Sequence, residues 1–336
     1  HRSRPPGRAA VPEPGGLAGP HSHVTTSARQ LHQSSCTESP AMTANAPTAP
    51  VFQTPAKTTA NAARNVFPRR TSVHIQGRQT ILRSVRAEWI KLWTLRSTWI
   101  TSFIAIALTV LFGAGLTAAF GQSEQYQDAA KDFITQGLTF GQVVVAVLGA
   151  LIITGEYSSG QIRSSLAAVP KRGQLLASKA VVLAVVSFLL GSLSVFLSWA
   201  ISKPFIGEHA GSLTDSHYAG HIWGSGLVFA VIALMALGLG FLLRSTAGTV
   251  TVIVSLLFII SGPLQLAASK WPWVFKIIGC LPSTVAEAVS DPFQRTTEWG
   301  AQGVQFLSHG QAIAVFVAWA LVPLIAAWVV FSRRDA

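Results

Sequence analysis

The sequence predicts an all-α, polytopic integral membrane protein with six transmembrane helices, preceded by an N-terminal interfacial helix and a disordered N-terminal tail. Half of the 336 residues are hydrophobic and only 11% are charged, whereas soluble domains carry about 25% charged residues. About 20 apolar residues in a helix cross the hydrocarbon core, and lipid forces the backbone to form its own hydrogen bonds. Six stretches of at least 22 residues lack Asp, Glu, Lys and Arg: Ser97–Ser123, Phe133–Gly155, Ala180–Ser202, Ile222–Leu243, Ser245–Ser269 and Gly310–Ser332.

Residues 1–79 form a basic tail rich in Pro, Ala, Thr and Ser. They contain nine Lys or Arg and two acidic residues, and so supply +7 of the net charge of +12. Such a segment buries too little apolar surface to offset its ordering entropy, so we expect disorder. The chain opens on His1, and we expect natural translation to begin at Met42, with residues 1–41 outside the native protein. No aromatic or folded basic module accompanies the tail, which argues against a nucleic-acid partner.

Residues 80–98 (TILRSVRAEWIKLWTLRST) predict an amphipathic helix at the membrane surface. Leu82, Val85, Trp89 and Leu92 fall near one helical face, while basic residues occupy the others. This pattern suits a helix that lies at headgroup depth and contacts membrane lipid. The alternative is a stretch of basic residues that only flanks the first span.

The distribution of Lys and Arg predicts the orientation of the spans. Twelve basic residues fall on one side: Arg78, Arg83, Arg86, Lys91, Arg96, Arg163, Lys171, Arg172, Lys179, Arg244, Arg333 and Arg334. Five basic residues fall on the other side: Lys131, Lys203, Lys270, Lys276 and Arg295. That side also contains eight acidic residues. The positive-inside rule therefore places both termini and loops 2–3 and 4–5 in the cytoplasm.

Loop 2–3, Thr154–Gly173, is polar, basic and short, with helix signals of its own. We expect Gly155 and Gly160 to end the second span, and a short helix over Gln161–Ala168 to be capped by Ser158 or Ser159. The exposed face of that helix is predicted to present Gln161, Ser164 and Ser165 together with the apolar Ile162 and Leu166. Two interpretations stay open from the residues alone: a docking element for a soluble partner, or a loop whose basic residues only set topology.

Several functions are disfavoured. The uncharged spans lack the Asp, Glu or His that ion-coupled transporters place in the membrane, and they show no ligand cluster for a membrane metalloenzyme. The sequence contains no GxxxxGK[ST] phosphate-binding loop, so any ATP would be bound by another chain. No cofactor is predicted. The long outer segment, Lys270–His309, is expected to form one or two short helices rather than a seventh span.

Three segments of the chain resemble motifs of a known transporter family. EWIKLWTLRSTW (Glu88–Trp99) resembles the E-x-x-K-x-x-T-x-R-S-T-W segment before span 1 of ABC-2 type transporter permeases, particularly actinobacterial ones. GEYSSGQIRSSLAAVPKRG (Gly155–Gly173) is similar to that family's G-E-[YF]-[ST]-[ST]-G-x-I-R-x-[ST]-L loop, and LLRSTAG (Leu242–Gly248) to its inner turn between spans 4 and 5, which contains Arg244. The resemblance covers residues 80–334, with the transmembrane domain at 99–334.

The resemblance implies an export half-transporter in the plasma membrane that is not itself an enzyme. Two permease chains, identical or different, would form the pathway, and separate ATP-binding subunits would dock beneath them. The helix after span 2 would be the coupling helix, and residues 80–98 the elbow helix, with Glu88, Trp89, Lys91 and Arg96. Glu156 is expected to pair with Arg96 or another base, and Ile162 and Leu166 to fill the partner's groove. The implied coupling residues are Glu156, Tyr157, Ser158, Ser159, Gly160, Ile162, Arg163 and Leu166.

The substrate and one competing function stay open. The apolar spans suit export of a hydrophobic drug, antibiotic or lipid, but they suit plain helix packing equally well, and a polysaccharide or peptide cargo is an alternative. A membrane sensor or resistance protein that works without ATP is the competing function from another class.

Overall fold

The computed structural model describes residues 80–121, 123, 130–207, 216–290 and 307–333. The predictions for residues 1–79, including the start at Met42, lie outside this range. All regular structure in the described residues is helical, as the sequence predicts. Six helical segments are long and apolar enough to cross a membrane, and each contains one of the six uncharged stretches almost completely.

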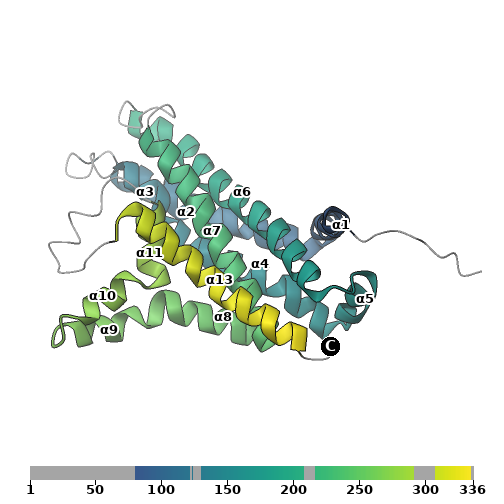
Figure 1. Cartoon of the computed structure of the whole chain (residues 1–336). Helices are drawn as coiled ribbons and strands as arrows, with labels where there is room; N and C mark the ends of the chain where they lie inside the picture. Colours follow the sequence, from purple (N-terminus) through teal and green to yellow (C-terminus); the bar gives the residue numbers. More distant parts are fainter. Residues whose placement is uncertain (1–79, 122, 124–129, 208–215, 291–306, 334–336) are drawn as a thin grey trace, which may run out of the picture. The chain divides into compact units, whose positions relative to one another are not determined.

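Eight helical elements of the described residues form the spans (Figure 1). Span 1 is α2 (Arg96–Phe120), and span 2 is α4 (Leu138–Ser158), which follows the short α3 (Ala130–Gln136). Span 3 is α6 (Arg172–Ile206) and span 4 is α7 (Ser216–Leu243). Span 5 comprises α8 (Thr246–Val254), the π-helical segment η2 (Ser255–Ile259) and α9 (Ser261–Ala268), and span 6 is α13 (His309–Arg333).

Helix α7 is the centre of the bundle. It contacts α4, α6, α8, α11 and α13. In its most apolar stretch 72% of the residues are buried, compared with 11% in that of span 5. Phe229, Met235 and Leu237 on α7 are almost completely inaccessible. A helix that is apolar all round fits this position because every face of it meets another helix.

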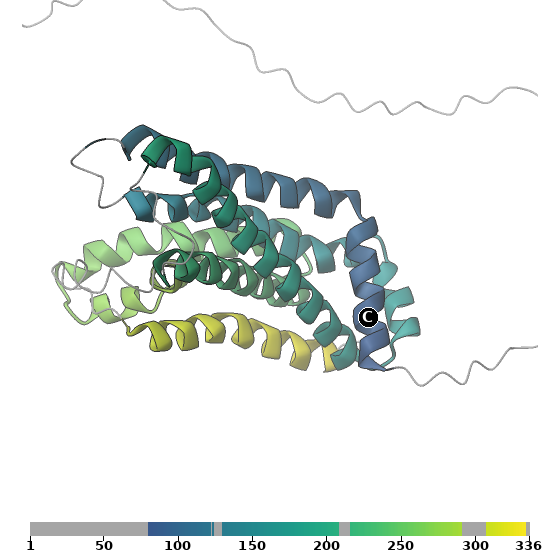
Figure 2. The same ribbon diagram turned by 90° about the horizontal axis from the view of Figure 1, so that it is seen from above.

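Short helices lie at both ends of the bundle. Helix α1 (Ile81–Thr94) runs crosswise to the spans, at the same end as α5 (Gln161–Ala168) and the end of α13 at Arg333 (Figure 2). We call this the α1/α5 end. At the opposite end, α10 (Val274–Gly279) and α11 (Pro282–Ser290) confirm the expected short helices in the segment after span 5.

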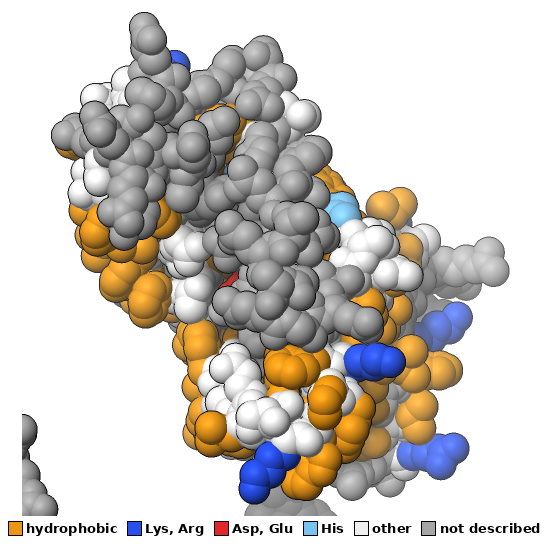
Figure 3. Space-filling view, turned by 90° about the vertical axis from the view of Figure 1, so that its left-hand side faces the viewer, with side chains coloured by type: hydrophobic (Ala, Val, Ile, Leu, Met, Phe, Trp, Pro, Cys, Tyr) orange, Lys and Arg blue, Asp and Glu red, His pale blue; other side chains and the backbone are white. Residues whose placement is uncertain are grey.

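The end formed by α3, α9, α10 and α11 presents hydrophobic side chains over much of its described surface, with Lys and Arg at scattered points (Figure 3). Trp271, Trp273 and Leu266 are more than half exposed there. Tryptophan is typical of the interfacial region of a bilayer. This arrangement is consistent with a segment that reaches the headgroup level without crossing.

Three boundaries differ from the predictions. The amphipathic segment does not form one helix over residues 80–98, because Leu95 adopts an extended conformation that separates α1 from α2. Span 2 does not end at Gly155, since α4 continues to Ser158 and therefore contains Glu156. Span 3 likewise begins before its uncharged stretch and contains Lys179. The membrane-spanning helices thus do carry charged residues near their α1/α5 ends.

Candidate functional site

The candidate site is built first on one face of α1. Ser84, Glu88 and Leu92 are its buried residues, and their spacing of four places them above one another on a helix. This face packs against α6, where the Gln174 amide donates a hydrogen bond of 2.8 Å to the Ser84 hydroxyl. Polar contacts, rather than apolar packing alone, therefore hold α1 across the start of span 3.

Four charged side chains form a buried cluster at the point where α1, α4 and α6 meet. The Lys179 ammonium on α6 donates to Glu88 of α1 at 2.9 Å, and it also pairs with Glu156 of α4. Lys91 of α1 pairs with the same Glu156 oxygen. We call Glu88, Lys91, Glu156 and Lys179 the ion cluster. Its two carboxylates and two ammonium groups balance, so the cluster has no formal net charge.

The burial of the ion cluster makes its pairing important. The Lys179 side chain is fully inaccessible and that of Glu156 is 3% exposed, whereas that of Lys91 is 24% exposed. A cavity of about 200 Å³, lined in part by Lys91, Gly155 and Glu156, reaches the cluster from the surface. Removing one partner of a buried ion pair costs about 3–5 kcal/mol, because the remaining charge is left uncompensated. The ion cluster therefore ties α1, α4 and α6 together.

A second group of contacts joins the last turn of α4 to the other spans. The Arg244 guanidinium lies over the Tyr157 ring, 4.8 Å from its centroid, and the Phe241 ring meets Tyr157 edge-on at 6.4 Å. Phe241 in turn packs edge-on against Phe331 of α13 at 5.1 Å. The Arg172 guanidinium at the start of α6 donates to the Phe331 carbonyl at 2.7 Å. Spans 2, 3, 4 and 6 are thereby connected around Tyr157.

A hydroxyl pair extends this connection to span 5. The Thr154 and Thr246 Oγ1 atoms are 2.6 Å apart and join α4 to the first turn of α8. Arg244, just before α8, has a φ of +51°, and it is the single non-glycine residue with positive φ in the described ranges. This backbone conformation makes the tight turn between spans 4 and 5 and places the guanidinium over Tyr157.

Helix α5 projects from α4 through a sharp turn. Gly160 has a φ of +70°, a conformation that glycine adopts without the steric cost of a Cβ atom, and it redirects the chain into α5. Ile162 at 4% exposure and Val169 at 9% anchor the two ends of α5 in the main hydrophobic core. Gln161, Arg163 and Ser164 face solvent. The result is a short helix held from beneath, with a polar outer face.

The structure brings together only part of the predicted site. Glu88, Lys91 and Glu156 meet in the ion cluster, and Tyr157 meets Arg244, whereas Trp89 lies half-buried beside an apolar cavity between α1, α2 and α6. Arg96 is exposed at the start of α2, and the described residues that pair with Glu156 are Lys91 and Lys179. Of the two expected pairings, that of Glu156 with Arg96 is not formed, and that of Glu156 with another base is formed.

Three local predictions about loop 2–3 are wrong. Ser158 and Ser159 do not cap α5, because their hydroxyls donate back to the Gly155 carbonyl at 3.1 and 2.7 Å, and Gly160 occupies the N-cap position. Ile162 is not on the exposed face, since the core of the same chain covers it. Leu166 is half-buried and packs against that core. The outer face of α5 is therefore more polar than predicted.

Lys179 is a residue of the ion cluster that the sequence motifs do not single out, because its position in the sequence indicates only a basic residue that sets orientation. A signal was available, because Lys179 stands one helical turn inside an otherwise apolar segment, and a charge in that position is usually paired. Among the described residues, no group of three or more His, Cys, Asp or Glu is arranged to hold a metal ion.

Comparison with known proteins adds one finding. A family model described as ABC-2 family transporter protein matches residues 84–262, somewhat more than half of the chain. The matched region contains α1 from Ser84 onward, α5, the whole ion cluster and Arg244. No curated protein matches the chain.

Proposed function

This chain belongs to the ABC-2 family of transporter membrane proteins, and on that premise we propose that it is the permease subunit of an ATP-driven exporter. In this proposal α5 is the coupling helix that docks on a separate ATP-binding subunit. The observation that carries the proposal is the attachment of α5. Its neighbour Glu156 is joined to both α1 and α6, and Tyr157 contacts Arg244 after span 4.

Coupling requires that the permease interact differently with the two states of the ATPase. The ATP-bound and empty ATPase dimers must favour different arrangements of the permease. A displacement of α5 would be transmitted to α4 directly, to α1 and α6 through the ion cluster, and to α7 through Tyr157 and Arg244. Because a buried ion pair is costly to break, these helices move as one body in response to α5.

The docking surface in this proposal is polar. Ser158, Ser159, Gln161, Arg163 and Ser164 are exposed, and the apolar Ile162 serves as the internal anchor of α5. Arg163 is the charged group that would meet an acidic rim on the partner. Such a contact would depend on hydrogen bonds and charge more than on burial of a large apolar plug.

The remaining parts of the proposal follow from the charge distribution and the family. The α1/α5 end faces the cytoplasm of the cell, both termini are on that side, and a second permease chain completes the pathway in the plasma membrane. The elbow helix is α1, and the transmembrane domain begins with α2 at Arg96. The cargo is a hydrophobic compound such as a drug, antibiotic or lipid, because the spans offer mainly apolar surface.

Site-specific photocrosslinking tests the docking surface. A photoreactive amino acid at Ala167, exposed on α5, should yield a crosslink to a subunit with a nucleotide-binding fold, identified by mass spectrometry. The same amino acid at Ser332, exposed near the end of α13, serves as the control. Export should stop when vanadate blocks the ATPase. Export that persists without any ATPase would contradict the proposal and favour an ATP-independent protein.

A further inference from the structure

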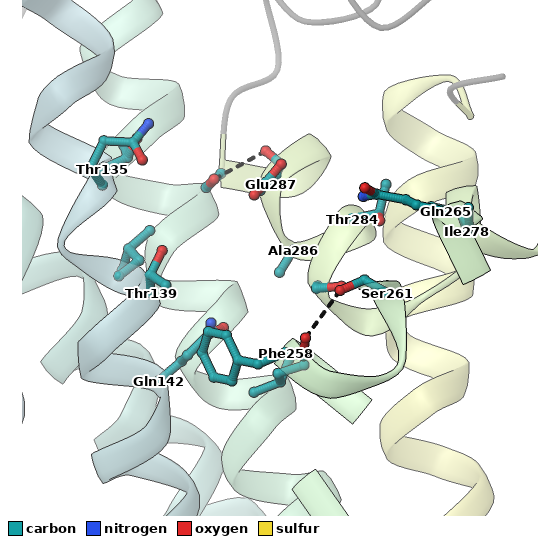
Figure 4. A pocket seen from close by; sticks show the side chains of 15 residues that line it. Thr135, Thr139, Gln142, Phe258, Ser261, Gln265, Ile278, Thr284, Ala286 and Glu287 are labelled. Carbon is teal, nitrogen blue, oxygen red and sulfur yellow. Dashed lines mark hydrogen bonds between the residues drawn. The ribbon is translucent and has the colours of Figure 1, made fainter. Parts of the chain in front are cut away.

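A second cavity lies at the end of the bundle opposite α5. It has a volume of about 240 Å³ and is enclosed by α3 and α4 on one side, η2 and α9 on another, and α10 and α11 on the third (Figure 4). Gln142 and Phe258 border it together, while Gln265 extends toward Thr284 across from them. None of these residues belongs to the ion cluster or to α5.

The lining of this cavity is rich in uncharged hydrogen-bonding groups. It includes three primary amides, those of Gln136, Gln142 and Gln265, and the hydroxyls of residues such as Thr139, Ser283 and Thr284. No Lys or Arg is among the described residues that line it, and the single charged group is the carboxylate of Glu287. The chemistry therefore suits a neutral hydrogen-bonding ligand and disfavours an anion.

Much of this hydrogen-bonding capacity is unused by the described part of the chain. The Ser261 hydroxyl donates to the Phe258 carbonyl at 3.2 Å, and that of Ser290 donates to the Glu287 carbonyl at 3.0 Å. The side-chain amides of Gln142 and Gln265, by contrast, make no hydrogen bond to any described residue. Gln142 is 93% buried as a residue, but its amide is not among the fully buried side-chain groups that lack a partner, so it is accessible from the cavity. Gln265 is exposed. Water or the polar groups of a ligand in the cavity can therefore hydrogen-bond to both amides.

The backbone of span 5 is irregular where it borders the cavity. Segment η2 has π-helical geometry, with the Ile260 amide donating to the Ser255 carbonyl at 2.9 Å across five residues. This wider turn places Leu257 and Phe258 against the cavity. Single π-helical turns within α-helices occur often at functional sites. Polar side chains within spans likewise mark pathways through the membrane.

We propose that this cavity binds the uncharged, hydroxyl- or amide-rich head group of an amphiphilic export substrate. The cavity is somewhat smaller than the roughly 300–1,000 Å³ of pockets that enclose drug-sized ligands, so it takes a head group while the apolar remainder stays among the spans. Phe258 supplies an apolar surface beside Gln142, and Gln265 and Thr284 supply the opposing donors and acceptors. This inference rests on the proposed export function, whose substrate it narrows.

Cysteine protection on the full chain in lipid nanodiscs tests the inference without the ATPase. In a background with Cys36→Ala and Cys280→Ala, Ser261→Cys places a thiol in the cavity, and Leu266→Cys places one on the exposed face of the same helix. The reaction of each thiol with N-ethylmaleimide is followed by mass spectrometry. Decyl glucoside, the neutral probe, should slow labelling at position 261 several-fold and leave position 266 unchanged. Decyl sulfate, with the same alkyl chain and an anionic head, should protect neither.

A second substitution separates head-group binding from partitioning into lipid. Gln142→Leu should raise the decyl glucoside concentration needed for half-protection about fivefold, the effect of one lost hydrogen bond. Gln311→Leu, an exposed glutamine of α13 that does not line the cavity, should leave it unchanged. The proposal is overturned by equal protection at both thiols, by protection with decyl sulfate, or by no reaction or no protection at position 261. Each of these results would leave the α5 crosslinking experiment, and with it the proposed function, unaffected.

Discussion

At the scale of single residues, Glu156 has the most consequential position in the chain. It is buried on the last turn of α4, and it accepts from ammonium groups on two other helices. Its second carboxylate oxygen is buried without a hydrogen-bond partner in the described residues. The side chain is therefore held by charge pairing rather than by a complete set of hydrogen bonds, and its loss leaves one ammonium group in excess.

Glu156→Gln should abolish export while the protein still inserts into the membrane. The variant leaves Lys91 and Lys179 facing Glu88 alone, and we expect it to lose about 3 kcal/mol of stability, at the lower end for a broken buried pair. The thermal unfolding midpoint in detergent and an export assay measure the two effects. The double variant Glu156→Gln with Lys91→Gln restores neutrality and should recover much of the lost stability. A double variant less stable than the single one would contradict this role of charge.

Arg163→Glu should separate coupling from stability. Arg163 is exposed on α5 and has no ion-pair partner among the described residues, so the thermal midpoint should stay unchanged. Export should fall about tenfold or more, because a charge-assisted contact with the ATPase is worth about 1.5–3 kcal/mol. Arg333→Glu, exposed at the end of α13, is the matched control and should export normally. Full export by the α5 variant would count against α5 as the coupling helix.

At the scale of elements, α5 shows how far local sequence signals reach. Its bounds, Gln161–Ala168, are those that the sequence predicts, because a glycine precedes it and a proline follows it closely. The cap was predicted wrongly, since α4 continues past Gly155 and draws both serine hydroxyls back to its own last turn. Capping signals identify an end but do not identify which of two adjoining helices uses them.

Two glycine substitutions near this turn should change the stability of the protein in opposite directions. Gly160→Ala places a Cβ atom on a residue with a φ of +70° and should cost about 1–2 kcal/mol, although no atom lies within 4 Å of the new carbon. Gly155→Ala, inside α4 and also with open space around the new carbon, should stabilise by about 0.5–1 kcal/mol. Thermal unfolding of both variants in one detergent makes the comparison. A lower midpoint for the Gly155 variant would show that another contact dominates at that position.

At the scale of the whole molecule, orientation connects the two ends of the bundle to their functions. The α1/α5 end carries most of the Lys and Arg that flank the spans. The end of α13 and the start of α1 lie there as well (Figure 2). An even number of spans requires both flanking segments to be on the same side of the membrane. Under the positive-inside rule that side is the cytoplasm.

Reporter fusions check this orientation. A fluorescent protein joined after Ala336 should be fluorescent in intact cells, because it folds in the cytoplasm. Alkaline phosphatase joined after Gly207, at the end of span 3, should be active because that position is predicted to lie outside. The reverse pattern would place α5 outside the cell, where no ATP-binding subunit can reach it, and would exclude the proposed coupling.

The sequence by itself determined the number, helical nature and approximate bounds of the spans. Each depends on a local property, an uncharged stretch longer than the hydrocarbon core, that needs no knowledge of neighbours. The bounds of the short helix Gln161–Ala168 likewise depend on local signals in the sequence. The family resemblance also depended on local motifs, since residues 84–262 carry them in linear order.

Only the tertiary structure decided which residues meet. Lys179 and Glu156 are 23 positions apart, and Lys91 and Glu156 are 65 apart, so neither spacing indicates a contact. Ile162 appears exposed from its helix alone and is buried because the ends of α5 pack onto the core. The unpaired amides of Gln142 and Gln265 share a cavity only because η2 and α11 close around it. Pairing and burial are properties of the assembled helices, whereas membrane insertion is a property of each segment.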